Sequence, residues 1–490
     1  MEPIDRGCIV YIIVDRLILI QGRAPAYRLA SNQLHKAAAR NIDLWSMESE
    51  SEPRVVDTVQ LVPVPAPVVP MSAPLSVLDS DHNVFDVDFR TLRIFPSHPP
   101  SIDPFLVLQR AFAAALGVFP QMAGSVHDDG RVLVSGSAVP LVLAVSDLRA
   151  DQVDADRLDA ALLQLLVPSD RVAAAEPALA LKATVFACGG VALGMRCAHA
   201  LCDGAGAGKF LAAAALFAQG LEPAVTPVWE RQERLGSRRA PRWAVPFERV
   251  LAPHKDKDVG PYSRHGQAVA RECFHVSDAS VEALRKQLSA EAGLKLTTFE
   301  VIAAFIWRAR VKANGSRPDE VVKMVYSMNV SRILEPALPD GYWGNACVPV
   351  YVALAAGELV GQGLADTAAL IRRSKQAVDD EYVRSYIDFQ EMHRRRGERL
   401  TAGGGVSAFT DWRRLGHSEV DFGWGRPDVV LPLSWRIIGS TFPCFLLPYS
   451  STDERRRRGF KVLVALMDHA LPCFTHQMQD LHSPTPMPKL

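Results

Sequence analysis

Two short apolar segments joined by a pair of glycines are the feature that most restricts the fold of this chain. Residues 184–188 and 191–197 are rich in side chains that favour strands, and Gly189-Gly190 separates them. Two adjacent glycines supply the positive φ angles of a tight hairpin turn. The apolar run 205–218, which ends at Gly220, indicates a buried helix directly after the hairpin. The sequence therefore predicts antiparallel strands and helices packed in one fold.

A long proline-rich stretch divides the chain into two parts of similar character. Residues 222–262 contain six prolines and many charges, and they show no sustained periodicity. A connection of that length indicates a crossover or a linker between domains. A polar, acidic stretch begins at Met47 and separates residues 1–46, which differ in character, from the rest of the chain. We therefore predict an atypical extension at 1–46, an N-terminal domain at 47–221, a crossover linker at 222–262 and a C-terminal domain at 263–490.

The second part repeats the mixture of strands and helices seen in the first. We expect strands at 268–275, 322–329, 347–354, 441–448 and 459–466, and helices at 279–291, 298–314 and 358–397. Earlier in the chain, Asp103-Pro104 is typical of a helix start, and short strands are expected at 132–134 and 141–145. Two mixed halves rich in hairpins indicate the α+β class.

Charge and cysteine usage restrict the partners and the compartment. Lys and Arg total 54 and so do Asp and Glu, so no overall field attracts nucleic acid or an anionic membrane. The apolar N-terminal run 8–20 is interrupted by Asp15 and Arg16 and is too short to span a bilayer, which needs about 20 apolar residues. The eight cysteines include no C-x-x-C pair, a pattern typical of free thiols in a reducing compartment. We expect a cytoplasmic monomer.

The segment from His199 to Gly204, with the sequence HALCDG, is the sharpest candidate for chemistry. A histidine stands where the second hairpin strand ends, and Asp203 and Gly204 precede the helix. A neutral imidazole can accept a proton near pH 7, and a nearby carboxylate can fix the loop or the tautomer. The same pattern is also compatible with a purely structural arrangement, in which Asp203 caps the helix and His199 is a buried, hydrogen-bonded histidine.

Two other ligand sites suggested by this segment fail on spacing. Cys197, His199 and Cys202 match no common zinc pattern, so no metal is expected. Gly208-Lys209 suggests a phosphate loop, but such a loop needs glycine where Asp203 stands and serine or threonine where Phe210 stands. The small residues here are better explained by close helix packing.

A second segment, Asp421-Phe422-Gly423-Trp424-Gly425, identifies a family when it is combined with the first. The chain resembles the BAHD family of plant acyl-CoA-dependent acyltransferases, which pair H-x-x-x-D-G in mid-chain with D-F-G-W-G near the C-terminus. The resemblance extends from about residue 54 to the end. Further matches in the same order are Leu75-Ser76-Val77-Leu78-Asp79, Phe119-Pro120-Gln121-Met122-Ala123-Gly124, Thr298-Phe299-Glu300 through Trp307-Arg308, and Gly341-Tyr342-Trp343-Gly344-Asn345. Relatives often carry a second histidine before the first motif, where this chain has Ala198.

The resemblance implies a fold and a mechanism. It implies two similar mixed αβ domains, like chloramphenicol acetyltransferase, with a solvent channel between them. His199 would be the general base in that channel. Acyl-CoA would be the co-substrate and a small molecule the acceptor, with no permanently bound cofactor.

The resemblance also assigns supporting roles. Asp203 and Gly204 would support the base loop, with Arg332 as the partner of Asp203. Thr410 and Trp412 would line the channel and help to stabilise the oxyanion. Asp421, Phe422, Gly423, Trp424 and Gly425 would form a structural motif away from the reacting atoms.

Two other functions remain open at this stage. One is a non-catalytic relative that acts as an accessory protein in a lipid-elongation complex, an analogy based on the 410–424 region. The other is a peptide-bond-forming condensation domain, which has a related fold and a similar His-Asp-Gly loop. The absence of carrier or adenylation modules and the presence of the Asp421 segment argue against it. The acyl donor, the acceptor and the choice between O- and N-acylation are beyond the sequence.

Overall fold

The computed structural model describes residues 55–63, 71–134, 138–156, 160–171, 176–254, 269–403, 406–440, 442–449 and 458–481. The predicted extension at 1–46 lies outside these residues. Arg54–Leu490 forms one compact unit. The domain boundaries expected within it, at 221 and 263, stay predictions.

The first half of this unit is built on a six-stranded mixed sheet. β6 and β7 pair in parallel, and the other neighbours are antiparallel. The strand order is β1 (Val55–Val62), β6 (Val139–Ser146), β7 (Leu179–Phe186), β8 (Val191–Ala198), β3 (Asp88–Phe95) and β15 (Val429–Pro432). The last strand, β15, comes from the second half of the chain, which thus contributes one strand to the first sheet.

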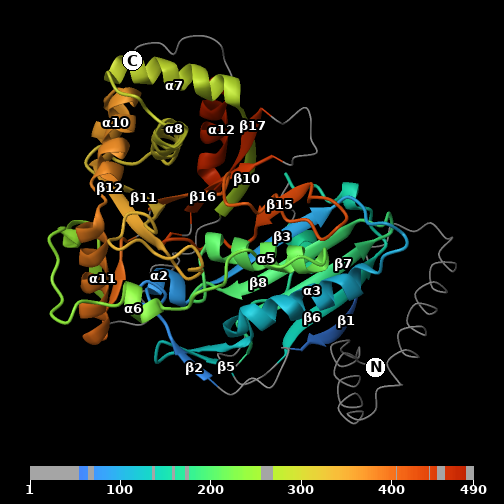
Figure 1. Ribbon diagram of the computed structural model, residues 1–490. Coiled ribbons are helices and arrows are strands. Elements are labelled where there is room, and N and C mark those ends of the chain that lie inside the picture. Colours follow the sequence, from blue (N-terminus) through green and yellow to red (C-terminus); the bar gives the residue numbers. More distant parts are fainter. Residues whose placement is uncertain are drawn as a thin grey trace, which may run out of the picture. The chain divides into compact units, whose positions relative to one another are not determined.

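Two helices cover one face of this sheet (Figure 1). They are α3 (Pro104–Val118) and α5 (Gly204–Ala218), whose buried faces share a hydrophobic core with the strands. α3 begins where the sequence predicts, because the Asp103 carboxylate accepts hydrogen bonds from the backbone of Phe105 and Leu106. Smaller elements around this core are β2 (Met71–Pro74), β4 (Ser125–His127), β5 (Arg131–Val134), α2 (His82–Phe85) and α4 (Ala160–Leu165).

The second half contains another six-stranded sheet. β14 pairs in parallel with both β11 and β16, and the remaining pairs are antiparallel. The order is β10 (Val269–Ser277), β17 (Gly459–Met467), β16 (Phe442–Pro448), β14 (Ser407–Asp411), β11 (Val321–Asn329) and β12 (Cys347–Ala355). The helices of this half are α7 (Asp278–Ala292), α8 (Thr298–Ala313), α9 (Ala356–Gly361), α10 (Leu364–Gln376), α11 (Asp380–Arg395) and α12 (Leu471–Asp480).

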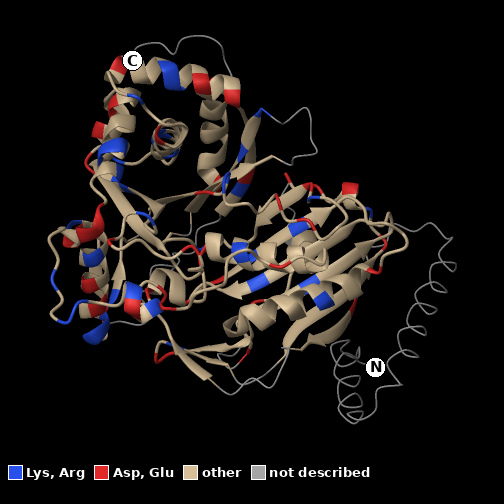
Figure 2. Ribbon diagram, in the orientation of Figure 1, with Lys and Arg blue, Asp and Glu red and all other residues tan. Residues whose placement is uncertain are grey.

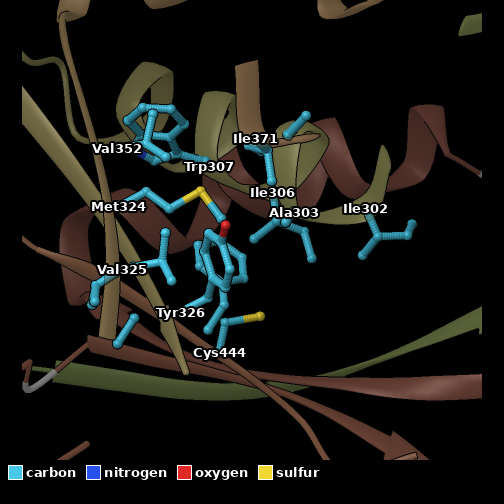
Figure 3. Packing of buried hydrophobic residues seen from close by; sticks show 14 of the residues in the cluster. Ile302, Ala303, Ile306, Trp307, Met324, Val325, Tyr326, Val352, Ile371 and Cys444 are labelled. Atoms are coloured by element: carbon cyan, nitrogen blue, oxygen red, sulfur yellow. The ribbon is translucent and has the colours of Figure 1, made fainter. Parts of the chain in front are cut away.

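A dense core joins α8 to the second sheet. Trp307 of α8 is fully buried and packs close to Met324 and Val352 of the neighbouring strands (Figure 3). Large apolar side chains buried in this way supply most of the stability of such a half. The surface helices α7 and α11 carry both signs of charge (Figure 2). Among the helices of the described residues, none combines the length and apolar character needed to cross a bilayer.

The hairpin is confirmed, with one correction to its turn. Gly189 has a φ of 78°, but Gly190 has no positive φ. A Cβ at Gly190 would lie 2.7 Å from the Cβ of Ala150 and 3.1 Å from the carbonyl oxygen of Phe95. The second glycine is therefore needed for close packing rather than for turn geometry.

The single helix expected at 358–397 is wrong. The chain forms α9, α10 and α11 there, because helix starts interrupt the run. The Asp379 side chain accepts a hydrogen bond from the Tyr382 amide and caps α11, and Gly363 precedes α10. The stretch 222–262 likewise contains short elements that the sequence did not predict, α6 (Arg231–Leu235) and β9 (Ala252–His254), the latter paired with β13 (Arg399–Thr401).

Candidate active site

His199 lies in the short loop between the end of β8 and the start of α5. Its backbone amide donates to the Val87 carbonyl at 2.8 Å, and its own carbonyl accepts from Asn345 Nδ2 at 2.8 Å. The ring packs edge-on against Phe89, with centroids 5.4 Å apart. Nδ1 lies 3.1 Å from Asn345 Oδ1. The imidazole is therefore held on its Nδ1 side, while the residue stays partly exposed.

The surroundings of His199 favour a neutral ring. Burial lowers the pKa of His199 below its ordinary value of 6.5, against the weaker opposing effects of a hydrogen bond with its own backbone and of Asp203, Asn345 and Asp79. Nε2 has no protein partner among the described residues. A neutral imidazole with one uncommitted nitrogen is what proton abstraction near pH 7 requires.

Asp203 supports the loop through its hydrogen bonds. Its Oδ1 accepts from the Gly206 amide at 2.9 Å, which caps α5. Its Oδ2 accepts from the Ala346 amide at 3.1 Å and from Cys347 Sγ at 3.4 Å. The carboxylate thus ties the start of α5 to the segment that leads into β12.

Glycine is required where α5 passes that segment. A Cβ at Gly206 would lie 2.0 Å from the Trp343 carbonyl oxygen. No side chain is compatible with so close a backbone approach. The glycines after Asp203 therefore serve close packing, as the sequence analysis expects. Lys209, which also belongs to the rejected phosphate-loop pattern, instead donates from Nζ to the carbonyls of Asp340 and Tyr342 at 2.7 and 2.6 Å.

The expected pairing of Asp203 with Arg332 is wrong. Arg332 forms an ion pair with Asp340 at 2.7 Å, and both side chains are largely exposed. The Asp203 oxygens are already occupied by the backbone and by Cys347. Arg332 lies on the surface after the end of β11, and its guanidinium therefore pairs with the exposed carboxylate of Asp340.

A different arginine, Arg231 of α6, holds the His199 loop. It is fully buried and donates to the carbonyls of Ala200 and Leu201 at 3.4 and 2.5 Å. Its guanidinium forms an ion pair with Asp79 at 3.0 Å and lies 3.7 Å from the centroid of the Trp229 ring. The sequence reasoning missed it because it lies in the stretch interpreted as a linker; the only local signal was the nearby tryptophan.

The structure brings the Thr410–Trp412 segment to the start of α5. Thr410 lies near the end of β14 and is buried, and the Trp412 amide donates to the Leu446 carbonyl at 2.8 Å. A Cβ at Gly204 would lie 3.9 Å from Trp412 Cε2. An oxyanion role for Thr410 and Trp412 stays a prediction.

A buried histidine next to Trp412 was also missed. His417 stacks at an angle on Trp412, with centroids 4.8 Å apart, and its Nδ1 lies 2.8 Å from a guanidinium nitrogen of the buried Arg93. Burial and Arg93 hold the pKa of His417 well below its usual range. Neutral His417 therefore accepts a hydrogen bond from Arg93.

The Asp421 loop, residues 421–425, is closed by its own side chain. Asp421 Oδ1 accepts from the amides of Gly423 and Gly425 at 2.8 and 2.9 Å. Both glycines have strongly positive φ angles, 97° and 102°.

The two aromatic residues of the Asp421 loop pack against the first sheet and α3. Phe422 is buried against Phe95 and Phe112, and Trp424 packs on Phe95. All five residues thus make structural contacts in this loop.

Three side chains of the kinds that can ligate a metal come together around β10. Ligand atoms of Asp156, Cys273 and His275 lie within 4.8 Å of one another. Lys461 Nζ, however, lies 2.5 Å from Asp156 Oδ1, so an ammonium already neutralises that carboxylate. Cys197 and Cys202, considered with His199 from the sequence, are fully buried.

Comparison with known proteins decides the family. The model of the Transferase family matches residues 61–481. The chain belongs to the BAHD acyltransferase family. It is 30% identical over 433 residues to a spermidine sinapoyl-CoA acyltransferase of Arabidopsis thaliana, an alignment that covers 83% of this chain and 92% of the relative.

Solved structures show the same fold. Vinorine synthase superposes with a TM-score of 0.68 at 19% identity, covering 88% of this chain and 98% of that one. TRI101 of F. graminearum, complexed with coenzyme A and deoxynivalenol, gives 0.67 at 14% identity, covering 82% and 96%. The fold is therefore the chloramphenicol-acetyltransferase-like fold of BAHD enzymes, as predicted. The solvent channel between the two halves stays a prediction.

Proposed function

We propose that this acyltransferase moves an acyl group from an acyl-CoA thioester to a hydroxyl or amine of a small specialised-metabolism acceptor, with His199 as general base. The observation that carries the proposal is the His199 ring. Nδ1 is engaged by Asn345, Nε2 has no protein partner among the described residues, and burial lowers the pKa of the ring. The BAHD family membership and a structural neighbour with bound coenzyme A support the donor.

The reaction would proceed by direct attack in a ternary complex. Nε2 takes the proton from the acceptor as its oxygen or nitrogen bonds to the thioester carbonyl carbon. The tetrahedral intermediate then breaks its carbon–sulfur bond, and the departing CoA thiolate takes the proton back from Nε2. His199 ends the cycle neutral, so no other acid or base is required.

The cysteines near the loop argue against a covalent acyl-enzyme. Cys197 and Cys202 are fully buried, and burial raises the pKa of the Cys202 thiol well above its usual range. A buried thiol with a raised pKa forms little thiolate and is a poor nucleophile. Both cysteines serve packing, with Cys197 Sγ 3.9 Å from Met122 Sδ.

The acceptor is best approached by chemical class. The Arabidopsis relative is named for spermidine, an amine, so amines belong in the panel beside alcohols. A neutral amine and a hydroxyl both suit a neutral imidazole, whereas an ammonium must first lose a proton. If turnover keeps rising with pH after His199 is fully deprotonated, the acceptor is therefore an amine.

The central test is His199→Ala. Wild-type protein and variant are incubated with a panel of CoA thioesters and of alcohols and amines, and free CoA release is measured. We expect turnover to fall by about 10²–10⁴-fold, with CoA thioester binding retained. His127→Ala is the matched control, because within the described part of the chain the His127 ring has a single hydrogen-bond partner, the Ser125 hydroxyl.

Each outcome separates the alternatives. Transfer by His199→Ala at the wild-type rate would show that another group is the base. The accessory role would be favoured if the wild-type protein released no CoA with any combination of thioester and acceptor, and if a lipid-elongation complex lost activity without this protein. We also propose a monomer in the cytoplasm, to be tested by light scattering and cell fractionation.

A further inference from the structure

The side-chain amide of Asn345 connects His199 to a fully buried carboxylate. Its Nδ2 donates to Asp79 Oδ1 at 2.8 Å and to the His199 carbonyl at 2.8 Å. Its Oδ1 lies 3.1 Å from His199 Nδ1. Asn345 is itself buried, with 3% of its surface exposed. The amide thus bridges residues that are 146 and 266 positions away in the chain.

The orientation of this amide follows from its neighbours. The two atoms that face Nδ2, the Asp79 carboxylate oxygen and the His199 carbonyl oxygen, can only accept hydrogen bonds. The atom between them must be the NH₂ group, and the other amide atom is necessarily the oxygen. That oxygen faces Nδ1 and can only accept, so Nδ1 must carry a proton.

Asp79 is fixed as an acceptor by further contacts. Its Oδ2 accepts from the Ser76 amide and hydroxyl at 2.9 and 2.7 Å. Its Oδ1 also accepts from the Asn345 amide at 3.1 Å and pairs with Arg231 at 3.0 Å. Asp79 and the Arg231 side chain are both fully buried, so this arrangement cannot rotate freely.

We propose that Asn345 and Asp79 are positioning residues that hold neutral His199 in the tautomer protonated on Nδ1, so that the lone pair is on Nε2. The tautomer stands on geometry alone; its effect on rate rests on the proposed function of His199. The partner of one ring nitrogen sets the protonation of the other. In a base, the wrong tautomer leaves no lone pair where the acceptor proton arrives.

The arrangement also suits the protonated ring. When Nε2 takes a proton, Nδ1–H still donates to Asn345 Oδ1, so the bridge need not reorganise during the reaction. A preorganised partner of this kind costs no rearrangement at the moment of proton transfer. The amide oxygen adds partial negative charge without a competing base next to Nδ1.

The direct test is the tautomer itself. Nitrogen NMR of ¹⁵N-histidine-labelled wild-type protein distinguishes protonated from unprotonated ring nitrogens, and loss of signals in His199→Ala assigns those of His199. Measured at a pH where His199 is neutral, we expect Nδ1 to be protonated and Nε2 unprotonated. The reverse assignment in the folded wild-type protein would overturn the proposal whatever any variant does.

The functional test is Asn345→Ala. We expect mixed tautomers in the spectrum and a fall in kcat of roughly 10–100-fold, the range found when the partner that orients a metal-bound histidine is removed. KM for the CoA thioester should change little, because Asn345 is buried and its amide atoms are used by Asp79 and His199. Asn83→Ala is the matched control, since Asn83 is also buried and its Nδ2 also donates to an aspartate, Asp81, at 2.8 Å.

The result distinguishes this inference from the proposed function. If His199→Ala is inactive but Asn345→Ala keeps both the tautomer and kcat, then His199 is the base and the positioning role is wrong. If the Nδ1–H tautomer is present but His199→Ala is fully active, the tautomer is as inferred and the base assignment fails. An equal loss of kcat in Asn83→Ala would show that loss of any buried amide disturbs the site, and would also contradict the proposal.

Discussion

The two ends of α5 meet the two motif loops of this protein, and the loops are built in opposite ways. The His199 loop, residues 199–204, lies at the start of the helix and is held by partners from elsewhere in the chain, such as Asn345 and Arg231. The Asp421 loop approaches the other end, where Gln219 Nε2 donates to the Asp421 carbonyl at 2.7 Å. Its own aspartate satisfies its backbone.

This difference indicates how each loop serves the protein. In the His199 loop, Asn345 and Arg231 satisfy the carbonyls of residues 199–201 from outside and Asp203 caps α5, so the His199 ring can stay uncommitted at Nε2. The Asp421 loop, which closes on itself, buries Phe422 in the core of the first sheet and packs the partly buried Trp424 against that core. The first arrangement suits chemistry and the second suits packing.

The largest effect is expected where outside support is removed from the His199 loop. Arg231→Met leaves Asp79 as a buried charge without its ion-pair partner, at a cost of about 3–5 kcal/mol in the free energy of unfolding. It also frees the carbonyls of Ala200 and Leu201, so kcat should fall too. Chemical denaturation and CoA release measure the two effects.

Arg332→Met is the matched control for that variant. Its ion pair with Asp340 is exposed, so the loss should be below about 1 kcal/mol, with kcat unchanged. Equal effects of the two substitutions would mean that Arg231 does not hold the loop. A large effect of Arg332→Met alone would restore Arg332 as the supporting arginine.

A smaller effect is expected in the Asp421 loop. Asp421→Ala removes two hydrogen bonds to backbone amides near the surface, which should lower the free energy of unfolding by about 1–2 kcal/mol. The kcat of the folded variant should stay within about threefold of wild type, because positioning at His199 depends on other residues. Thermal unfolding and CoA release of the same sample measure both. If Asp421→Ala were as stable as wild type but as inactive as His199→Ala, the loop would have to contact the substrate.

The smallest expected effect is a shift of the acidic midpoint of the kcat/KM profile to a pH below that of an ordinary histidine. The pKa of His199 lies below its ordinary value of 6.5 because burial outweighs the charges of Asp203 and Asp79. Protonation removes the base, so kcat/KM should fall on acidification with a midpoint below 6.5, and Asp421→Ala should leave that midpoint in place. Initial rates between about pH 5 and 8 provide the measurement. A midpoint at or above 6.5 would show that a different group titrates or that the loop is more open than the structure shows.

Local patterns predicted much of this fold. The hairpin, α3, α5, α7 and α8 appear close to their expected positions, because their caps and apolar periods are short-range signals. The 358–397 run was misjudged because its average composition hides the helix starts at Leu364 and Asp380. β15 was missed because its four residues join the first sheet only through β3, more than 300 positions earlier.

The sequence by itself determined the family, the position of the candidate base His199 and the loop at Asp421, because these depend on residue types at fixed short spacings. Only the tertiary structure decided which groups hold that base. Asn345 and Asp79 meet at His199, and Arg231 replaces Arg332 beneath the loop, through contacts between segments that are distant in sequence. Such contacts depend on how the strands and helices pack in three dimensions, and no local spacing encodes them.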